Sequence, residues 1–526
     1  MDSFFTSLAQ KMGGQIQTDH LKLLTCLLAT YPSAYLFKAL PNASSKHLFS
    51  ILFSTYTLVA VLKSWAGFIH VTSTCLFTYF FMKYYRGPDG PWINFAVLMI
   101  SMALCHLDRQ FNDIRGDAVL DYSGAMMIAV IKLSGFGFNV LDGRTEAHSD
   151  FFKRMAIKGD YPTLVSFFGW MFFFAGFLIG PSFDYMDYIR LVTLPLNETS
   201  PTPLTDKQRR ITLSVKNPLT MLLLKVFVLI LGLIYIHPTY NYEALLTKPY
   251  TDLPFVSRFI FVQIASTMTR FRFYTVWFLT EGACMISGIA FNGFDENDQP
   301  LWDRVTNANL GTEWSPSVRM TSVRWNSGAN RWLNRYVYMR VGTPGSKKGV
   351  KAMALTYVVS SVWHGFHSGY YGNITERYNG IHSAHTFSFK AFFLISALLQ
   401  YVGVTMRRLV RPLLMTPDMM HELPLKKLYD MAGVFITVSC LNLTCASFFL
   451  LESTKYMSAF RSVYNYHYIA ILVGGGALMV AKPTLIALQK KRVARYQQDK
   501  QQQADQVEGL EVKQPQTDKS AVFKTE

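Results

Sequence analysis

Apolar residues gather in repeated blocks along the chain, separated by short polar stretches. A helix that crosses a bilayer needs about 20 mostly apolar residues, because the hydrocarbon core is about 30 Å thick. By this length criterion the blocks predict an all-α fold, a polytopic transmembrane helical bundle of about eleven spans. The blocks cover residues 21–40, 47–63, 67–83, 92–107, 122–139, 163–180, 218–237, 256–269, 273–291, 351–371, 388–405, 432–451 and 467–488.

Two of the blocks contain a charged residue. Block 122–139 carries Lys132, and block 256–269 carries Arg258. A charged side chain is unfavourable in hydrocarbon, whereas a protein environment tolerates it. We therefore expect tilted or re-entrant helices here, surrounded by protein.

Two polar stretches interrupt the apolar pattern. Residues 292–350 mix arginine with tryptophan, which predicts amphipathic helices in the headgroup layer; a solvated basic loop is the alternative. Residues 489–526 are charged and rich in glutamine, which predicts a helix extension that fades into a disordered tail. We thus divide the chain into an N-terminal segment 1–20, a membrane domain 21–488 and this tail. The tryptophans of the first stretch are Trp302, Trp314, Trp325 and Trp332.

The charge distribution bears on partners and topology. The chain has 51 Lys+Arg against 34 Asp+Glu and a net charge of +17. In a membrane protein such an excess belongs to cytoplasmic loops, and it is not gathered into one basic domain, so we predict no nucleic-acid partner. The basic run at residues 490–495, directly after the last block, predicts a cytoplasmic C-terminal tail. An odd number of spans would place the N-terminus in the lumen.

His364 is the first candidate for chemistry, in the segment KAMALTYVVSSVWHGFHSGYYGN. An ionisable side chain within an apolar span marks a functional candidate. A buried imidazole that stays neutral keeps a nitrogen lone pair, which a general base needs to accept a hydroxyl proton. The alternative is a core histidine hydrogen-bonded between helices.

Two other functions fit the sequence less well. His364 and His367 form an H-x-x-H pair, as do His382 and His385, but membrane di-iron enzymes need roughly eight or more ligands in several boxes. We therefore expect no metal. A transporter is the other alternative, but transporters of many classes contain internal repeats, and the two halves of this chain show no similarity.

The segment TSVRWNSGANRWLNRYVYMRV at 321–341 places a Trp-Asn pair before the histidine span. Here the sequence resembles the membrane-bound O-acyltransferase family, whose two functional residues are an asparagine in such a segment and a histidine in a following apolar helix. These correspond to Asn326 and His364.

Further matches are similar to the lysophospholipid acyltransferase branch of the family. They are DYSGAMMIAVIKLSGFGFNVLDGR at 121–144, PSFDYMDY at 181–188, RFRFYTVWFLTEGACMISGIAFNG at 270–293 and WHGFHSGYY at 363–371. Together they cover most of residues 120–375 in the family's order.

The resemblance implies an enzyme of the endoplasmic reticulum membrane. It would transfer a fatty acyl group from acyl-CoA to the free hydroxyl, at sn-2, of a lysophospholipid, with no cofactor besides this co-substrate. His364 would be the base, and Asn326 would orient the histidine or the substrate, or donate to the thioester oxygen. The alternative is acyl transfer to another lipid or to a protein hydroxyl. No serine or cysteine in an elbow-type context is evident, so we expect direct transfer.

Several other side chains are candidates for substrate contacts. Each has an alternative role as half of a buried ion pair. Arg335 and Arg340, with Lys347 and Lys348, are expected near the phosphates of CoA, because arginine binds anions in a bidentate manner. The substrate-binding candidates are Lys132, Asp184, Glu281, Trp325, Arg335 and Arg340.

Overall fold

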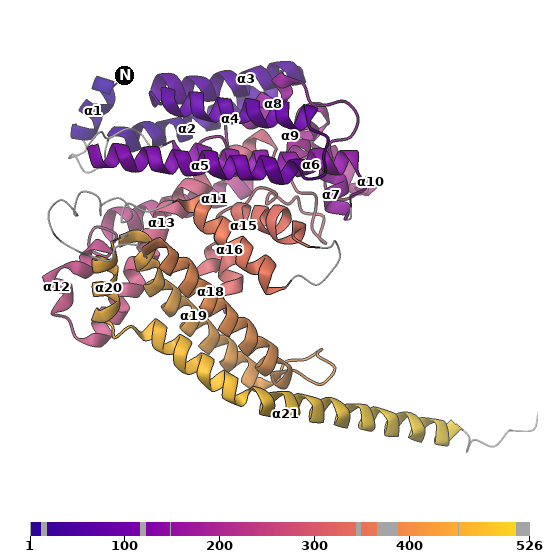
Figure 1. Ribbon diagram of the computed structural model, residues 1–526. Coiled ribbons are helices and arrows are strands. Elements are labelled where there is room, and N and C mark those ends of the chain that lie inside the picture. The colour runs from indigo at the N-terminus through magenta and orange to yellow at the C-terminus, as the bar shows by residue number, and fades with distance from the viewer. Residues whose placement is uncertain are drawn as a thin grey trace, which may run out of the picture.

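The computed structural model is helical, which confirms the predicted all-α class. It describes residues 2–11, 18–115, 122–147, 149–342, 349–365, 388–450 and 452–511, and in these ranges only isolated β-bridges accompany the helices. Figure 1 shows the N-terminal helices side by side as one layer, with the later helices packed below them and α21 extending outward.

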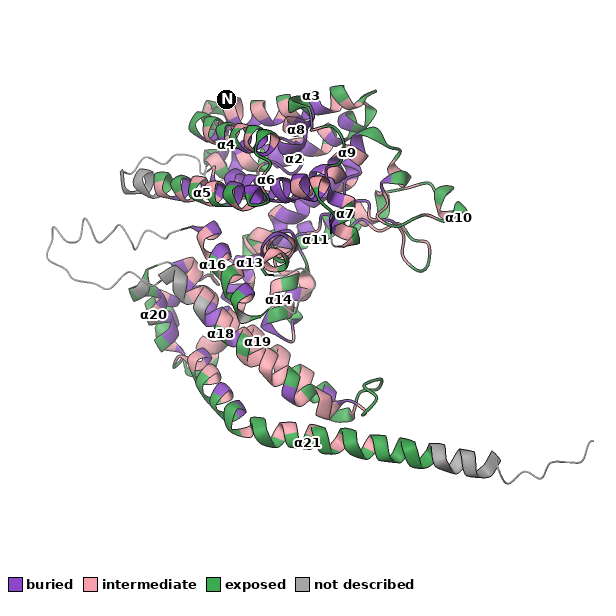
Figure 2. Ribbon diagram, turned by 45° about the vertical axis from the view of Figure 1, so that its right-hand side comes forward, coloured by how far each residue is buried: buried purple, intermediate pink, exposed green. Residues whose placement is uncertain are grey.

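The N-terminal layer surrounds the largest apolar core of the molecule. Its elements are α1 (Asp2–Lys11), α2 (Thr18–Ala39), α3 (Ala43–Tyr56), the π-helix η1 (Thr57–Val61), α4 (Trp65–Tyr84), α5 (Gly90–Arg115), α6 (Ser123–Arg144), α7 (Asp150–Met155), α8 (Leu164–Met171) and α9 (Tyr185–Thr193). Helix α6 lies at the centre of this core and is almost entirely buried (Figure 2). Lys132 on α6 is only 3% exposed. Protein therefore surrounds this charge, as predicted, although the helix is continuous.

Apolar block 163–180 forms a short helix and not a span. Helix α8 ends at Met171, and the chain then turns, with Gly176 N donating to Phe173 O at 3.0 Å. A Cβ on Gly176 would lie 2.6 Å from the Pro181 carbonyl oxygen. The turn therefore packs too closely for any residue larger than glycine.

The middle of the chain contains one long helix where two blocks were predicted. Helix α13 runs through 33 residues and joins blocks 256–269 and 273–291. Arg270 interrupts the apolar pattern, but its Nε donates to Glu313 at 2.8 Å and its guanidinium also donates to Asn442 at 2.8 Å. Because these partners satisfy the charge inside the protein, the helix continues. The elements here are η2 (Leu196–Thr199), α10 (Asp206–Arg209), α11 (Lys216–Tyr235), η3 (Glu243–Leu246), α12 (Lys248–Thr251) and α13 (Phe255–Ser287).

The polar stretch 292–350 folds into short helices, and two of its tryptophans are not at the surface. Trp302 is 7% exposed and Trp332 is 2% exposed, both within the largest core, whereas Trp314 is 75% exposed. The short helices turn Trp302 and Trp332 inward, and the placement of this segment in the headgroup layer stays a prediction. The elements are η4 (Leu310–Trp314), α14 (Val318–Arg324), α15 (Ser327–Trp332), η5 (Leu333–Val337) and η6 (Tyr338–Arg340).

The C-terminal helices form a separate apolar cluster against α13, except that the first of them contributes Val359 and Trp363 to the largest core. They are α16 (Val350–His364), α18 (Ser388–Val410), η8 (Arg411–Leu414), α19 (Pro424–Leu450), α20 (Ser453–Ser462) and α21 (Tyr466–Glu511). Helix α21 continues well past residue 488, so the predicted helix extension is present. Residues 512–526 lie outside the described residues.

Five helices in the described ranges are long and apolar enough to cross a membrane. They are Gly90–Arg109, Ser123–Arg144, Lys216–Tyr235, Pro424–Leu450 and Tyr466–Gln503. The count of about eleven spans stays a prediction.

Candidate active site

His364 is the last residue of α16 and lies where three helices meet. Its ring centroid is 4.7 Å from that of Trp363, and 5.6 Å from those of Phe393 on α18 and Phe448 on α19. These aromatic rings surround the imidazole with apolar surface. The His364 side chain is partly buried, and its role as a base stays a prediction.

Two hydrogen bonds hold the end of α16 in place. The Trp363 indole Nε1 donates to the Met127 carbonyl of α6 at 3.1 Å, and His106 Nε2 of α5 donates to the Trp363 carbonyl at 3.1 Å. The next residue, Gly365, has a φ of 107°, and a Cβ there would lie 2.7 Å from the His106 ring. Only glycine fits this position. The sequence analysis missed His106, although an ionisable ring in block 92–107 is the signal that marks such residues.

Asn326 caps the N-terminus of α15 from a left-handed backbone conformation. Its φ is 43° and its Oδ1 accepts from Ala329 N at 3.4 Å. Asparagine tolerates this conformation better than most residues. Within the described chain the Nδ2 group of Asn326 has no hydrogen-bond acceptor, so it can donate to a substrate. The adjacent Trp325 packs its ring against Tyr274 and Trp277 of α13, at 5.5 and 5.0 Å.

A continuous series of aromatic contacts connects the two candidate segments. The His364 ring contacts Phe448, Phe448 contacts Phe449 at 5.2 Å, and Phe449 contacts Phe273 of α13 at 6.0 Å. Phe273 in turn lies 5.7 Å from Trp325. We call this series the aromatic wall. It places the histidine and the Trp-Asn pair at opposite ends of one surface.

Glu281 of α13 supports the asparagine through the backbone of a loop. Its Oε1 accepts from Asn307 N at 2.6 Å and from Ala308 N at 2.8 Å, and the carboxylate is buried. The side-chain Oδ1 atom of Asn307 accepts from Gly328 N at 3.0 Å. The backbone carbonyl of Asn307 accepts from Ser327 N at 3.1 Å. A Cβ on Gly328 would lie 2.2 Å from the Asn307 Oδ1 atom. The chain of contacts thus positions the first residues of α15, directly after the asparagine.

These contacts predict how Glu281 substitutions behave. Glu281→Leu leaves two buried N–H groups without acceptors, at about 1–3 kcal/mol each, so we expect a lower thermal midpoint and a lower kcat. Glu281→Gln keeps an Oε1 acceptor, so its thermal midpoint and its kcat should both stay close to those of the wild type. Thermal denaturation and steady-state kinetics of the purified variants provide the measurement. If Glu281 instead binds substrate through its charge, the Gln variant will lose activity as fully as the Leu variant.

Arg340 and Lys132, two of the substrate-binding candidates, have protein partners. The Arg340 guanidinium forms a bidentate ion pair with Asp142 of α6, at 2.8 and 2.5 Å. The Lys132 ammonium donates to the carbonyls of Trp170 and Met171, at 2.5 and 3.2 Å. For Arg340 the ion-pair alternative is therefore the observed arrangement.

A cavity of about 330 Å³ lies beside α15 and η5. It is lined by Lys132, Asp184 and Arg335 of the predicted residues, whereas Glu281 and Trp325 do not line it. Asp184 there accepts from the Tyr336 hydroxyl at 2.5 Å and from the side-chain amide of Asn139 at 3.0 Å.

Arg331, which lines this cavity, remains cationic near neutral pH. Burial lowers the pKa of Arg331 to about 10, and the neighbouring Arg335 adds to the lowering. Because that pKa is still well above 7, Arg331 carries its charge at physiological pH.

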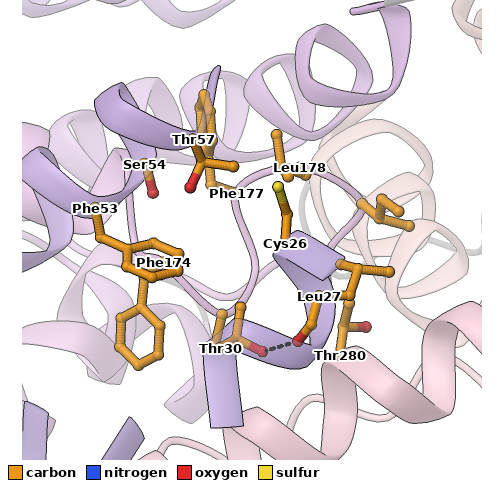
Figure 3. A pocket seen from close by; sticks show the side chains of 12 residues that line it. Cys26, Leu27, Thr30, Phe53, Ser54, Thr57, Phe174, Phe177, Leu178 and Thr280 are labelled. Atoms are coloured by element: carbon orange, nitrogen blue, oxygen red, sulfur yellow. Dashed lines mark hydrogen bonds between the residues drawn. The ribbon is translucent and has the colours of Figure 1, made fainter. Parts of the chain in front are cut away.

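A second cavity, between α2, η1, α13 and the turn after α8, is too small for a substrate. Figure 3 shows it lined by Phe53, Phe174, Phe177 and neighbouring side chains. Its volume is about 10 Å³, roughly the room that one water molecule needs.

The other residues named from the sequence lie outside the described residues. They are Lys347 and Lys348 of the expected CoA contacts, and His367, His382 and His385 of the metal alternative.

Fold and site together define the class of this protein: a multi-pass membrane protein, helical throughout the described ranges, with a histidine among aromatic rings inside its bundle. The model of the membrane-bound O-acyltransferase family matches residues 11–375. The chain therefore belongs to the membrane-bound O-acyltransferase family, as the motifs predicted.

Curated relatives match over most of the chain. It is 32% identical to a lysophospholipid acyltransferase of Schizosaccharomyces pombe, over 87% of this chain and 86% of the relative. It is 28% identical to a lysophospholipid acyltransferase of Saccharomyces cerevisiae, over 90% of this chain and 75% of the relative. To lysophospholipid acyltransferase 5 of Mus musculus it is 27% identical, over 70% of this chain and 73% of the relative.

Proposed function

We propose that this protein transfers a fatty acyl group from acyl-CoA to the free sn-2 hydroxyl of a lysophospholipid. The observation that carries the proposal is the family match over residues 11–375, which includes Asn326 and His364, and the aromatic wall joins the segments of these two residues. The activity in the names of the fungal relatives supports the choice of acceptor.

In the proposed reaction His364 acts as a general base. Its imidazole removes the proton of the lysophospholipid hydroxyl as the oxygen attacks the thioester carbonyl. The new ester C–O bond forms, the C–S bond breaks, and the proton passes to the departing CoA thiolate. The aromatic rings around His364 suit this step, because electrostatic interactions with the transferred proton are stronger where water is excluded.

Asn326 is proposed to stabilise the developing oxyanion. Its Nδ2 group is a donor with no acceptor in the described chain. The hydrogen bonds that run from Glu281 through Asn307 to the first residues of α15 hold Asn326 in place. A preorganised donor of this kind lowers the barrier because it needs no reorganisation during the reaction. Orientation of the histidine or of the substrate is the alternative role.

The C-terminal tail is proposed to be cytoplasmic, in the endoplasmic reticulum membrane. The basic run at residues 490–495 lies on the exposed part of α21 (Figure 2), which suits the positive-inside rule.

A substrate panel tests the proposed function. Membranes from cells that express the chain are incubated with labelled oleoyl-CoA and with lysophosphatidylcholine, lysophosphatidylethanolamine, monoacylglycerol or a sterol. We expect label in diacyl phospholipid, released by a lipase specific for the sn-2 ester, and little in the neutral acceptors. Label that enters a sterol ester, a triacylglycerol or protein instead would contradict the proposal. Membranes without the chain are the control.

A further inference from the structure

The cavity beside α15 and η5 contains more basic than acidic groups. Four arginines and one lysine line it, against three aspartates. The lysine donates to two backbone carbonyls, and Arg154 and Arg304 each donate to the Thr199 carbonyl. Arg331, Arg335 and the Nε atom of Arg304 are the donors that remain for a ligand. Their arrangement indicates what that ligand is.

One aspartate is shared by three arginines. The Asp187 carboxylate lies 3.5 Å from Arg154, 3.6 Å from Arg190 and 3.6 Å from Arg304. A single carboxylate cannot neutralise three guanidinium groups. The Arg304 side chain is only 8% exposed, and within the described chain its Nε atom has no hydrogen-bond acceptor. This buried donor still needs an anion or a polar atom.

Arg331 and Arg335 have no carboxylate partner at all among the described residues. The two other aspartates of the cavity are engaged elsewhere, since Asp184 accepts from Tyr336 and Asn139, and Asp303 accepts from Asn292 at 2.9 Å. Arg335 stacks on a phenylalanine ring of α7 at 3.8 Å, which orients its guanidinium without neutralising it. Both arginines therefore present unpaired charge to the cavity.

We propose that this cavity binds a phosphate group of a substrate, through Arg331, Arg335 and Arg304. This proposal rests on the proposed function, because the substrates named there carry phosphate. Arginine suits the task, since its planar guanidinium donates two parallel hydrogen bonds to phosphate oxygens. The excess of positive charge in the cavity matches an anion, and the volume of about 330 Å³ accommodates a small polar group.

The phosphate can come from either of two sources. Arg331 lies five residues after Asn326 along the helix, a rise of about 7.5 Å. A lysophospholipid has its phosphate only a few bonds from the acceptor hydroxyl, which suits this short separation. CoA has its phosphates at the far end of the pantetheine arm.

Ligand binding to the purified full-length protein tests the cavity without requiring catalysis. The thermal midpoint is measured against increasing CoA and, separately, glycerophosphocholine. We expect stabilisation of the wild type by at least one of them, and a dissociation constant about 10- to 100-fold higher in Arg331→Gln/Arg335→Gln. Arg319→Gln, an exposed arginine on α14, is the matched control and should bind as the wild type does.

Steady-state kinetics distinguish the two sources. A rise in the KM for lysophosphatidylcholine alone assigns the cavity to the lysolipid phosphate, and a rise in the KM for oleoyl-CoA alone assigns it to CoA. Arg331→Lys keeps the charge but not the bidentate geometry, so its KM should be intermediate. Its thermal midpoint without ligand shows whether the fold is retained.

The two proposals fail in different ways. Wild-type protein that binds CoA or glycerophosphocholine through the arginines but transfers no acyl group would overturn the proposed function and leave the cavity assignment intact. Acyl transfer with both KM values and both affinities unchanged in the double arginine variant would overturn the cavity assignment. A wild type stabilised by neither ligand would overturn it as well.

Discussion

Substitution of His364 by alanine is expected to lower acyl transfer by about 10²- to 10⁴-fold, the usual contribution of a general base. The physical reason is that the rings of Trp363, Phe393 and Phe448, which contact the imidazole, accept no proton. The neighbouring His106 already donates its Nε2 hydrogen to the Trp363 carbonyl at 3.1 Å. The KM values should change far less than kcat, because the histidine acts on the transition state.

The His364 measurement needs a matched control and a check of folding. His367→Ala removes a histidine three residues away and should retain most of the activity. His364→Gln keeps a polar side chain of similar size, so it tests proton transfer with less disturbance of packing. All variants are compared at equal membrane expression in the oleoyl-CoA assay. Near-normal turnover by well-expressed His364→Ala protein would show that the base lies elsewhere.

Substitution of Asn326 is expected to lower kcat by about 10²- to 10³-fold if its amide stabilises the oxyanion. The choice of variant matters because φ is 43° at this position. Alanine there adds backbone strain of about 1–2 kcal/mol, so a loss of activity could reflect folding. Asn326→Gly removes the side chain without strain, and Asn326→Asp keeps the Oδ cap on Ala329 N but removes the amide donor. Both should lose turnover strongly while their thermal midpoints stay close to wild type.

A double-mutant cycle tests whether Asn326 and His364 serve one transition state. Groups that act as a unit are non-additive, so Asn326→Gly combined with His364→Ala should be little worse than the more damaging single change. Losses that multiply independently would show that Asn326 supports folding or substrate entry instead. Retention of most activity by Asn326→Asp would likewise remove the amide donor from the mechanism.

The sequence predicted the helical class and the family because both depend on local information. Apolar blocks of bilayer length define helices wherever they occur, and the motifs around Asn326 and His364 are contiguous in the chain. The same local criterion failed where tertiary partners override it. Block 163–180 turns after Met171, and two blocks merge in α13 because Glu313 and Asn442 satisfy Arg270.

The composition and order of the residues by themselves determined that this protein is an all-helical membrane protein and which two residues are its catalytic candidates. Only the tertiary structure decided the role of the remaining charges. Arg340 pairs with Asp142, 198 residues away in the chain, whereas Arg331 and Arg335 on the same segment face a cavity with no carboxylate partner in the described chain. The physical reason is that an ion pair or an open cavity depends on side chains brought together from distant segments, and no local pattern specifies which segments meet.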